Sequence, residues 1–351
     1  MSISSLAASP IAPKYVLLTN RKSMTPDLPA DGTEKLVFTL PSSLGKESEV
    51  SAYDRPEQAA PALQRPVLLI HGFTGAPENW KNMRTWLTSQ AANGDGGVVD
   101  PNSTSVDSKA KVFLMKFSRP FNSTKTNAAE LRQVIDKIAS ATGSREIDLV
   151  GHSMGGLDAR YYLEEGGEKV KNLVMIATPN RGSVLADNEL KFREMGLPVK
   201  PEEDDPEVRQ CVRDLCEDKV VNGKQNNPTL HEMNNTWSHQ KDSARILLIA
   251  GNGHATLQSS TLLTMWGDGT VPQNSVKMDG VPLKNIWGPD HSGVKEHPDA
   301  LIATANFLTD KSVDLTSQAP PNVKPDREFI PLQISASVDK IEYLIQDKQP
   351  K

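Results

Sequence analysis

The chain has 351 residues, a net charge of -5 at pH 7 and 24% charged residues, which suits one large globular domain with insertions. Acidic and basic residues are interspersed, so neither nucleic acid nor an anionic membrane is indicated as a partner. No apolar run approaches the roughly 20 residues that a bilayer-spanning helix requires, and we expect no integral membrane segment.

The first 64 residues are rich in Pro, Ser, Ala and Glu and form a predicted N-terminal extension. They start without a basic stretch followed by a sustained apolar core, so we expect no conventional signal peptide. The compartment then stays open between the cytoplasm and export by a signal-independent route. Two short runs, Tyr15 to Leu18 and Leu36 to Leu40, predict an outer hairpin or edge strands that lead into a linker.

From Pro66 onward, short continuous apolar runs alternate with helix-like periodicity. This alternation is typical of buried parallel strands that are joined by crossover helices. One helix is predicted to open at Pro77, and another to include Leu131 to Ile138. The order predicts an α/β fold with a doubly wound, mostly parallel sheet over residues 65–310. The predicted strands are Val67 to Ile70, Val112 to Phe117, Ile147 to Val150, Leu173 to Ala177 and Ile246 to Ala250.

Ser183 to Ser243 interrupts this alternation with a charged segment that includes the acidic run from Glu202 to Asp205. Because it precedes the last clear strand, we expect it to form a lid or cap over the carboxyl edge of the sheet. It also holds the only cysteines, Cys211 and Cys216, which are too few for a disulfide framework and are expected to be free thiols. Residues 311–351 form a C-terminal extension with a predicted strand and helix.

A candidate nucleophile lies in Gly151-His152-Ser153-Met154-Gly155, between the strand that ends at Val150 and a helix-like run. A serine hydroxyl is a weak nucleophile unless it is held clear of the backbone beside a base, and a sharp strand-to-helix turn does this. Glycines are needed on both sides because side chains there would collide across the turn. The strand and helix context therefore predicts Ser153 as a nucleophile, whereas the letters alone would fit an ordinary glycine-rich turn.

The first core strand ends in His71-Gly72-Phe73-Thr74-Gly75, where such a nucleophile needs a loop with a backbone N–H donor. The second donor is the residue after the serine, at the positive end of a helix. We assign the N–H groups of Phe73 and Met154 to an oxyanion hole. His71 precedes the serine in the chain, so its ring is expected to stabilise the loop rather than to act as the base.

Trp266-Gly267-Asp268-Gly269 offers an acid on a glycine-flanked loop after the last strand. Asp268 would accept the Nδ1–H of a histidine and stabilise the imidazolium, although an ordinary Asp-Gly turn is the alternative. Of seven histidines, only His291 and His297 follow it. We predict His291 as the base because it lies in a loop, whereas His297 immediately precedes Pro298 and a helix. The other histidines are expected on the surface or in loops: His152, His231, His239 and His254.

Together these motifs resemble the lipase and esterase branch of the α/β-hydrolase superfamily, especially bacterial triacylglycerol lipases. The resemblance covers Pro66 to Leu308 and rests on VLLIHGF, LVGHSMGGLDARYYL, LVMIATPNRGS, GDGTVP and the HSG loop. It implies a triad of Ser153, Asp268 and His291, with Phe73 and Met154 as oxyanion donors and no cofactor.

Besides the signal peptide that its secreted members have and that we do not see here, the sequence departs from that family in two respects. Several secreted members hold calcium through an aspartate shortly after the catalytic histidine, but Ser292-Gly293-Val294 supplies none, so no metal site is predicted. Lids in the family tend to have a broad apolar face, whereas Ser183 to Ser243 is mostly charged, which argues against strong activation at an oil-water interface.

We therefore interpret the chain as a carboxylic ester hydrolase that forms an acyl-enzyme from an acyl ester or lipid, with at most transient contact with a lipid surface. A phospholipase, including a secreted effector, and an acyltransferase are alternatives within the class. A catalytically silent hydrolase-fold binding protein is the alternative from another class, but it has no physical need for nucleophile, acid and base together.

Overall fold

In the computed structural model, residues 53–196, 204–257 and 264–316 are described, together with the backbone of four strands at 15–19, 36–38, 330–334 and 343–345. The chain divides into two units, one of residues 47–325 and one that combines 1–46 with 326–351. Residues 1–14, which the signal-peptide expectation concerns, lie outside the described residues.

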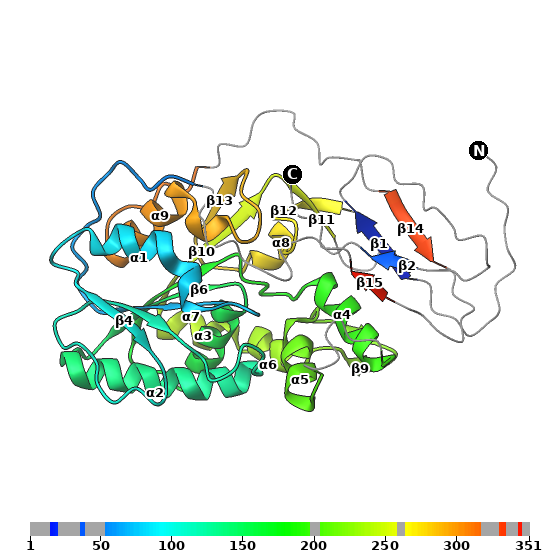
Figure 1. The fold of residues 1–351 in the computed structure, drawn as a ribbon, viewed down its shortest axis with the longest axis horizontal. Coiled ribbons are helices and arrows are strands. Elements are labelled where there is room, and N and C mark those ends of the chain that lie inside the picture. The colour runs from blue at the N-terminus through cyan, green and yellow to red at the C-terminus, as the bar shows by residue number, and fades with distance from the viewer. Residues whose placement is uncertain are drawn as a thin grey trace, which may run out of the picture. The chain divides into compact units, whose positions relative to one another are not determined.

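A seven-stranded parallel sheet organises the larger unit, in the order β13-β10-β7-β6-β3-β5-β4 (Figure 1). From β3 the chain runs to the edge strand β4, returns to β5 and then crosses to β6 and beyond. This doubly wound order confirms the predicted fold class. The strands are β3 (Val67–Ile70), β4 (Asp95–Val99), β5 (Val112–Met115), β6 (Ile147–His152), β7 (Val170–Ile176), β10 (Arg245–Asn252) and β13 (Leu283–Trp287).

Helices cover both faces of the sheet, with α1 and α9 on one side and α2 and α3 on the other (Figure 1). Strand β3 shows why a strand that is covered on both faces needs a continuous apolar run. Val67 and Leu69 belong to the core beneath α1 and α9, whereas Leu68 and Ile70 belong to the core beneath α2 and α3. The helices around the sheet are η2 (Pro77–Trp80), α1 (Lys81–Thr88), α2 (Thr124–Thr142), α3 (Met154–Glu164), α8 (Gln273–Val276), η4 (Val294–Glu296) and α9 (Pro298–Leu308).

The segment 183–243 is called the insertion below, and its described parts, 183–196 and 204–243, form short helices and a hairpin. Glu202 and Glu203 of its acidic run lie outside the described residues. Asp204 accepts from Arg193 at 3.1 Å and from Arg209 at 2.6 Å, so this part of the run serves local ion pairing. The elements are α4 (Val184–Glu194), α5 (Pro206–Leu215), β8 (Val220–Val221), β9 (Lys224–Gln225), α6 (Pro228–Asn235) and α7 (Trp237–Ser243).

The smaller unit pairs the two ends of the chain. Strand β1 (Tyr15–Thr19) is antiparallel to β14 (Ile330–Ile334), and β2 (Leu36–Phe38) is parallel to β15 (Tyr343–Ile345). The first two runs therefore pair with C-terminal strands and not with each other, so of the two alternatives the hairpin is wrong. The C-terminal extension contributes the described strands β14 and β15, and the helix expected there lies outside the described residues. Within the described parts of the chain, no helix is long and apolar enough to cross a membrane.

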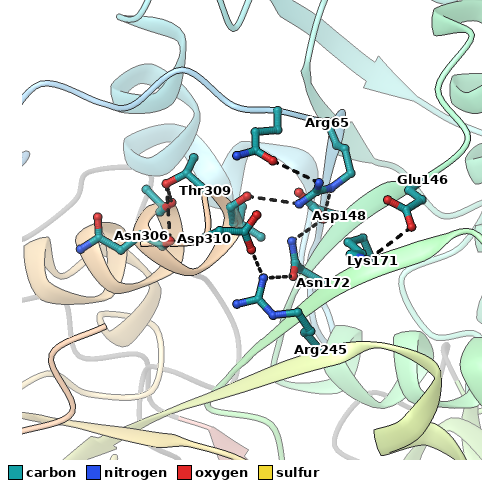
Figure 2. Close-up of polar contacts among 12 residues, drawn as sticks. Arg65, Glu146, Asp148, Lys171, Asn172, Arg245, Asn306, Thr309 and Asp310 are labelled. Atoms are coloured by element: carbon teal, nitrogen blue, oxygen red, sulfur yellow. Dashed lines mark hydrogen bonds and ion pairs between the residues drawn. The ribbon is translucent and has the colours of Figure 1, made fainter. Parts of the chain in front are cut away.

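A polar network joins the amino ends of the central strands (Figure 2). The buried carboxylate of Asp148 on β6 accepts from Nε of Arg65 at 3.1 Å and from Nδ2 of Asn172 at 2.8 Å. Arg245 on β10 donates to Asn172 at 3.2 Å and pairs with Asp310. Burial raises the pKa of Asp148 from 3.8 to about 6, although the ion pair with Arg65 and both hydrogen bonds oppose that rise.

This pKa makes the stability of the fold depend on pH through Asp148. Its folded-state pKa lies above its unfolded value, so its contribution is fully present below about pH 4 and is lost as the pH rises through about 6. The change is on the order of 3 kcal/mol. We expect wild type to lose stability relative to Asp148→Asn between about pH 4 and pH 7 in urea unfolding.

The control is Asp136→Asn, which removes a carboxylate whose side chain is 53% exposed and paired with Lys169. It reports the general effect of removing one negative charge. A free-energy difference between wild type and Asp148→Asn that stays constant over this pH range contradicts the prediction.

Candidate active site

Ser153 occupies a sharp turn between β6 and α3. Its φ of 52° and ψ of -122° are strained for a residue with a side chain. The turn is fixed on both sides, because Ser153 N donates to the carbonyl oxygen of Ile176 at 2.9 Å and Gly156 N donates to the carbonyl oxygen of Ser153 at 3.1 Å. The hydroxyl is thereby held at the carboxyl edge of the sheet, where the loops after the other strands converge.

The glycines that flank Ser153 are required by close backbone packing. A Cβ atom at Gly155 would lie 2.5 Å from the carbonyl oxygen of Ile70 and 2.6 Å from that of His71. A Cβ atom at Gly151 would lie 2.6 Å from the backbone of Gly155. Non-bonded contacts of real Cβ atoms are essentially never shorter than 3.0 Å, which agrees with the steric reason for glycine at both positions.

Ser153, His291 and Asp268 form a hydrogen-bonded chain. Nε2 of His291 lies 3.0 Å from the Ser153 hydroxyl, and Nδ1 of His291 lies 2.8 Å from Oδ2 of Asp268. A carboxylate only accepts hydrogen bonds, so Nδ1 carries the proton and Nε2 of the neutral ring accepts from the hydroxyl. His291 comes from the loop after β13, and Asp268 follows the hairpin of β11 (His254–Leu257) and β12 (Thr264–Gly267).

Asp268 holds its own loop as well as His291. Its Oδ1 accepts from the backbone N–H groups of Thr270 at 2.9 Å and Val271 at 2.7 Å, while Oδ2 faces His291. The carboxylate is 1% exposed, so all of these bonds form away from bulk water. The Asp-Gly turn considered as an alternative for Asp268 is therefore present, and the same side chain also bonds His291.

The loop after β3 lies against the serine. A Cβ atom at Gly72 would lie 2.8 Å from Cβ of Ser153 and 3.4 Å from the backbone nitrogen of Met154. The loop is closed by Gly75 N, which donates to the carbonyl oxygen of Gly72 at 3.0 Å. The stretch that contains Phe73 and the first residue of α3 thus meet beside the hydroxyl.

The histidines that do not belong to the hydrogen-bonded chain of Ser153, His291 and Asp268 have other partners or are exposed. Nδ1 of His71 donates to the carbonyl oxygen of Gly72 at 3.1 Å, and burial lowers the pKa of His71, as suits a ring that stabilises the loop. His297 accepts from the backbone N–H of Asp299 at 3.2 Å and caps α9, as predicted. His231 and His239 are exposed.

His152 does not lie where the sequence predicted it. It is the last residue of β6, only 1% exposed, and its Nε2 donates to the main-chain carbonyl of His291 at 2.9 Å. The apolar run predicts a strand that ends at Val150, which leaves His152 in a loop or on the surface, whereas β6 continues to His152. The signal available in the sequence was its position next to the serine on a strand buried on both faces.

Arg160 is a second supporting residue that the sequence did not single out. Its guanidinium on α3 is fully buried and donates to Gln240 at 2.9 Å, to Asn180 at 3.1 Å and to Asn234 at 3.0 Å. Burial lowers the pKa of Arg160 from 12.5 to about 9, which still leaves it charged at pH 7. One side chain therefore links the helix after the serine to the loop after β7 and to the insertion.

Part of the insertion packs on the residues around the serine. An apolar cluster joins Met154 and Phe121 to residues of α5 and α6, and the half-buried ring of Phe73 packs against it. Phe73 and Phe121 are in edge contact, with ring centroids 5.5 Å apart. Cys211 of α5 is a buried free thiol 3.7 Å from Sδ of Met154, and Cys216 is also free. Among the described residues, no group of three or more His, Cys, Asp or Glu is arranged to hold a metal ion.

Comparisons with known sequences identify the fold and distant relatives of the chain. A family model described as "alpha/beta hydrolase fold" matches residues 103–201, which include the serine turn. A triacylglycerol lipase from Pseudarthrobacter phenanthrenivorans is 28% identical over 128 residues, or 36% of this chain and 36% of that lipase. The chain therefore matches only about a third of the length of that relative.

Solved structures extend the likeness across the core. Phospholipase PlaB from Legionella pneumophila has a TM-score of 0.52 at 16% identity, over 71% of this chain and 61% of that chain. The propeptide form of lipase BlEst2 from Bacillus licheniformis has a TM-score of 0.51 at 17% identity, over 74% of this chain and 53% of that chain. At such identities the likeness shows a shared fold. The chain therefore has the α/β-hydrolase fold and is a distant homologue of bacterial triacylglycerol lipases.

Proposed function

We propose that this protein hydrolyses carboxylic esters through an acyl-enzyme on Ser153. The observation that carries the proposal is the hydrogen-bonded chain from the Ser153 hydroxyl through His291 to Asp268, with links of 3.0 Å and 2.8 Å. A hydroxyl, an imidazole and a carboxylate in this order are what a serine needs to become a nucleophile at neutral pH. The fold and the distant lipase homology agree with this chemistry.

In the proposed reaction, Ser153 Oγ attacks the ester carbonyl carbon while Nε2 of His291 takes the hydroxyl proton. Asp268 stabilises the imidazolium that forms. The N–H groups of Phe73 and Met154 would stabilise the tetrahedral oxyanion. His291 returns the proton to the leaving alcohol as the carbon–oxygen bond breaks. Water then attacks the acyl-enzyme with His291 as base, which releases the acid and restores the serine.

The surroundings of the serine favour an apolar acyl group. Ser153 is only 9% exposed, and apolar side chains gather beside it around Phe73, Phe121 and Met154. An acyl chain that enters this region exchanges water for apolar contacts, which favours binding. We propose that the insertion is the cap over this part of the site, because its helix α5 contributes to the same cluster.

The two candidate bases can be separated by a matched pair of variants. His291→Asn should lower kcat for p-nitrophenyl butyrate by about 10⁴-fold, as should Ser153→Ala and Asp268→Asn, because each breaks the same proton path. His297→Asn keeps an N-cap residue on α9 and should stay within about two-fold of wild type. Loss of turnover in folded His297→Asn, with His291→Asn still active, contradicts the assignment.

The oxyanion loop can be tested through Gly72. The methyl group of Gly72→Ala would meet Cβ of Ser153 at 2.8 Å and push the loop that carries Phe73 away from the serine. We expect kcat to fall by about 100-fold while KM changes less, since one misplaced donor mainly affects the transition state. Gly143→Ala is the control for a general loss of stability, because it strains the left-handed residue that ends α2 but meets nothing within 4 Å. A folded Gly72→Ala variant with wild-type kcat removes this loop from the oxyanion hole.

A fluorophosphonate probe separates the enzyme from a silent binding protein. The probe should label Ser153 in wild type and should label neither Ser153→Ala nor His291→Asn at a comparable rate. Turnover of triglyceride, phospholipid and soluble ester would then define the substrate class. Partition of the acyl group to an added alcohol would identify an acyltransferase.

A further inference from the structure

His152 contacts His291, the residue assigned as the base. The two rings are in contact, with centroids 4.9 Å apart and planes inclined by 43°. His152 is nearly fully buried at the end of β6, and Ser153 is the next residue in the chain. The ring therefore extends from the nucleophile's own strand toward the loop that carries His291.

The contact between them is a directed hydrogen bond. Nε2 of His152 lies 2.9 Å from the main-chain carbonyl oxygen of His291, and a carbonyl oxygen only accepts. Nε2 must therefore carry the proton. Burial lowers the pKa of His152 well below its usual range, and the neighbouring Lys295 and His291 lower it further. The ring stays neutral at ordinary pH and keeps one fixed donor.

The next carbonyl of the same loop is held in a similar way. Nζ of Lys295, a buried residue of η4, donates to the carbonyl oxygen of Ser292 at 2.9 Å. The loop is also closed on itself, because Gly293 N donates to the side chain of Asp290 at 2.7 Å. The bond from His152 differs from these two because it connects the main chain of this loop to the end of β6, directly before the serine.

We propose that His152 is a positioning residue for the reaction: by holding the main chain of His291, it keeps Nε2 of that ring within 3.0 Å of the Ser153 hydroxyl. This inference rests on the proposed function. A displacement of about 1 Å between reacting groups can cost about 100-fold in rate, so a bond that fixes the base relative to the nucleophile affects kcat directly.

Two variants separate positioning from mere filling of space. His152→Phe keeps an aromatic ring but has no donor, and His152→Gln keeps an N–H at a similar reach. For a soluble p-nitrophenyl ester, we expect His152→Phe to lower kcat by about 100-fold with KM within about two-fold, and to slow fluorophosphonate labelling in parallel. His152→Gln should recover at least about ten-fold of that loss.

Wild-type kcat in folded His152→Phe overturns the proposal, as does a Gln variant no better than the Phe variant. Ser153→Ala measured beside them separates two failures. Activity in Ser153→Ala contradicts the proposed function. An inactive Ser153→Ala variant beside a fully active His152→Phe variant contradicts only the positioning role of His152.

A measurement on the wild-type protein covers the case in which His152→Phe does not fold. Nitrogen-15 NMR of histidine-labelled protein at neutral pH should show one buried ring that is neutral with its proton on Nε2. Its signals should be absent from His152→Gln. A ring at this position with its proton on Nδ1 cannot donate to the carbonyl of His291 and overturns the proposal.

Discussion

The site depends on one close approach, in which the first turn of α3 packs directly against the end of β3. No side chain fits at Gly155, because its Cβ atom would lie 2.5 Å from the carbonyl oxygen of Ile70. The chain must therefore turn sharply between β6 and α3, and Ser153 absorbs the turn with a positive φ. The loop that contains Gly72 continues from the same end of β3, so this single contact brings both the serine and its neighbouring loop into place.

The loop with His291 must reach the serine from strands that lie on the opposite side of β6 from β3 in the sheet order. His291 follows β13, and β10 and β7 lie between that strand and β6. At about 4.8 Å per strand, the loop with His291 has to cover about 14 Å. A loop of that reach is not held by the sheet alone. The hydrogen bonds to Asp268 and from His152 fix its two sides, one at the ring and one at the main chain.

Much of the core was predictable from local patterns. The five predicted strands were short apolar runs, and each forms where it was expected, because burial on both faces leaves a continuous apolar signal. The edge strand β4 was missed because its sequence, DGGVV, is only partly buried and lacks that signal. The pairing of β1 with β14 joins the two ends of the chain, which no local pattern encodes. The three residues of the hydrogen-bonded chain were predictable from chain order, whereas the roles of His152 and Arg160 depend on what the fold packs around them.

The two oxygens of Asp268 give its loop a property that the sequence motif alone does not convey. One oxygen is engaged by the backbone of the turn, so the torsion angles of the side chain are set by the loop before any imidazole approaches. The direction of the second oxygen is thereby fixed in advance, and in the proposed reaction little rotational freedom would remain to be lost when the ring becomes charged. A glutamate at position 268, with one more rotatable bond, would lose this preorganisation even if its carboxylate reached the same point.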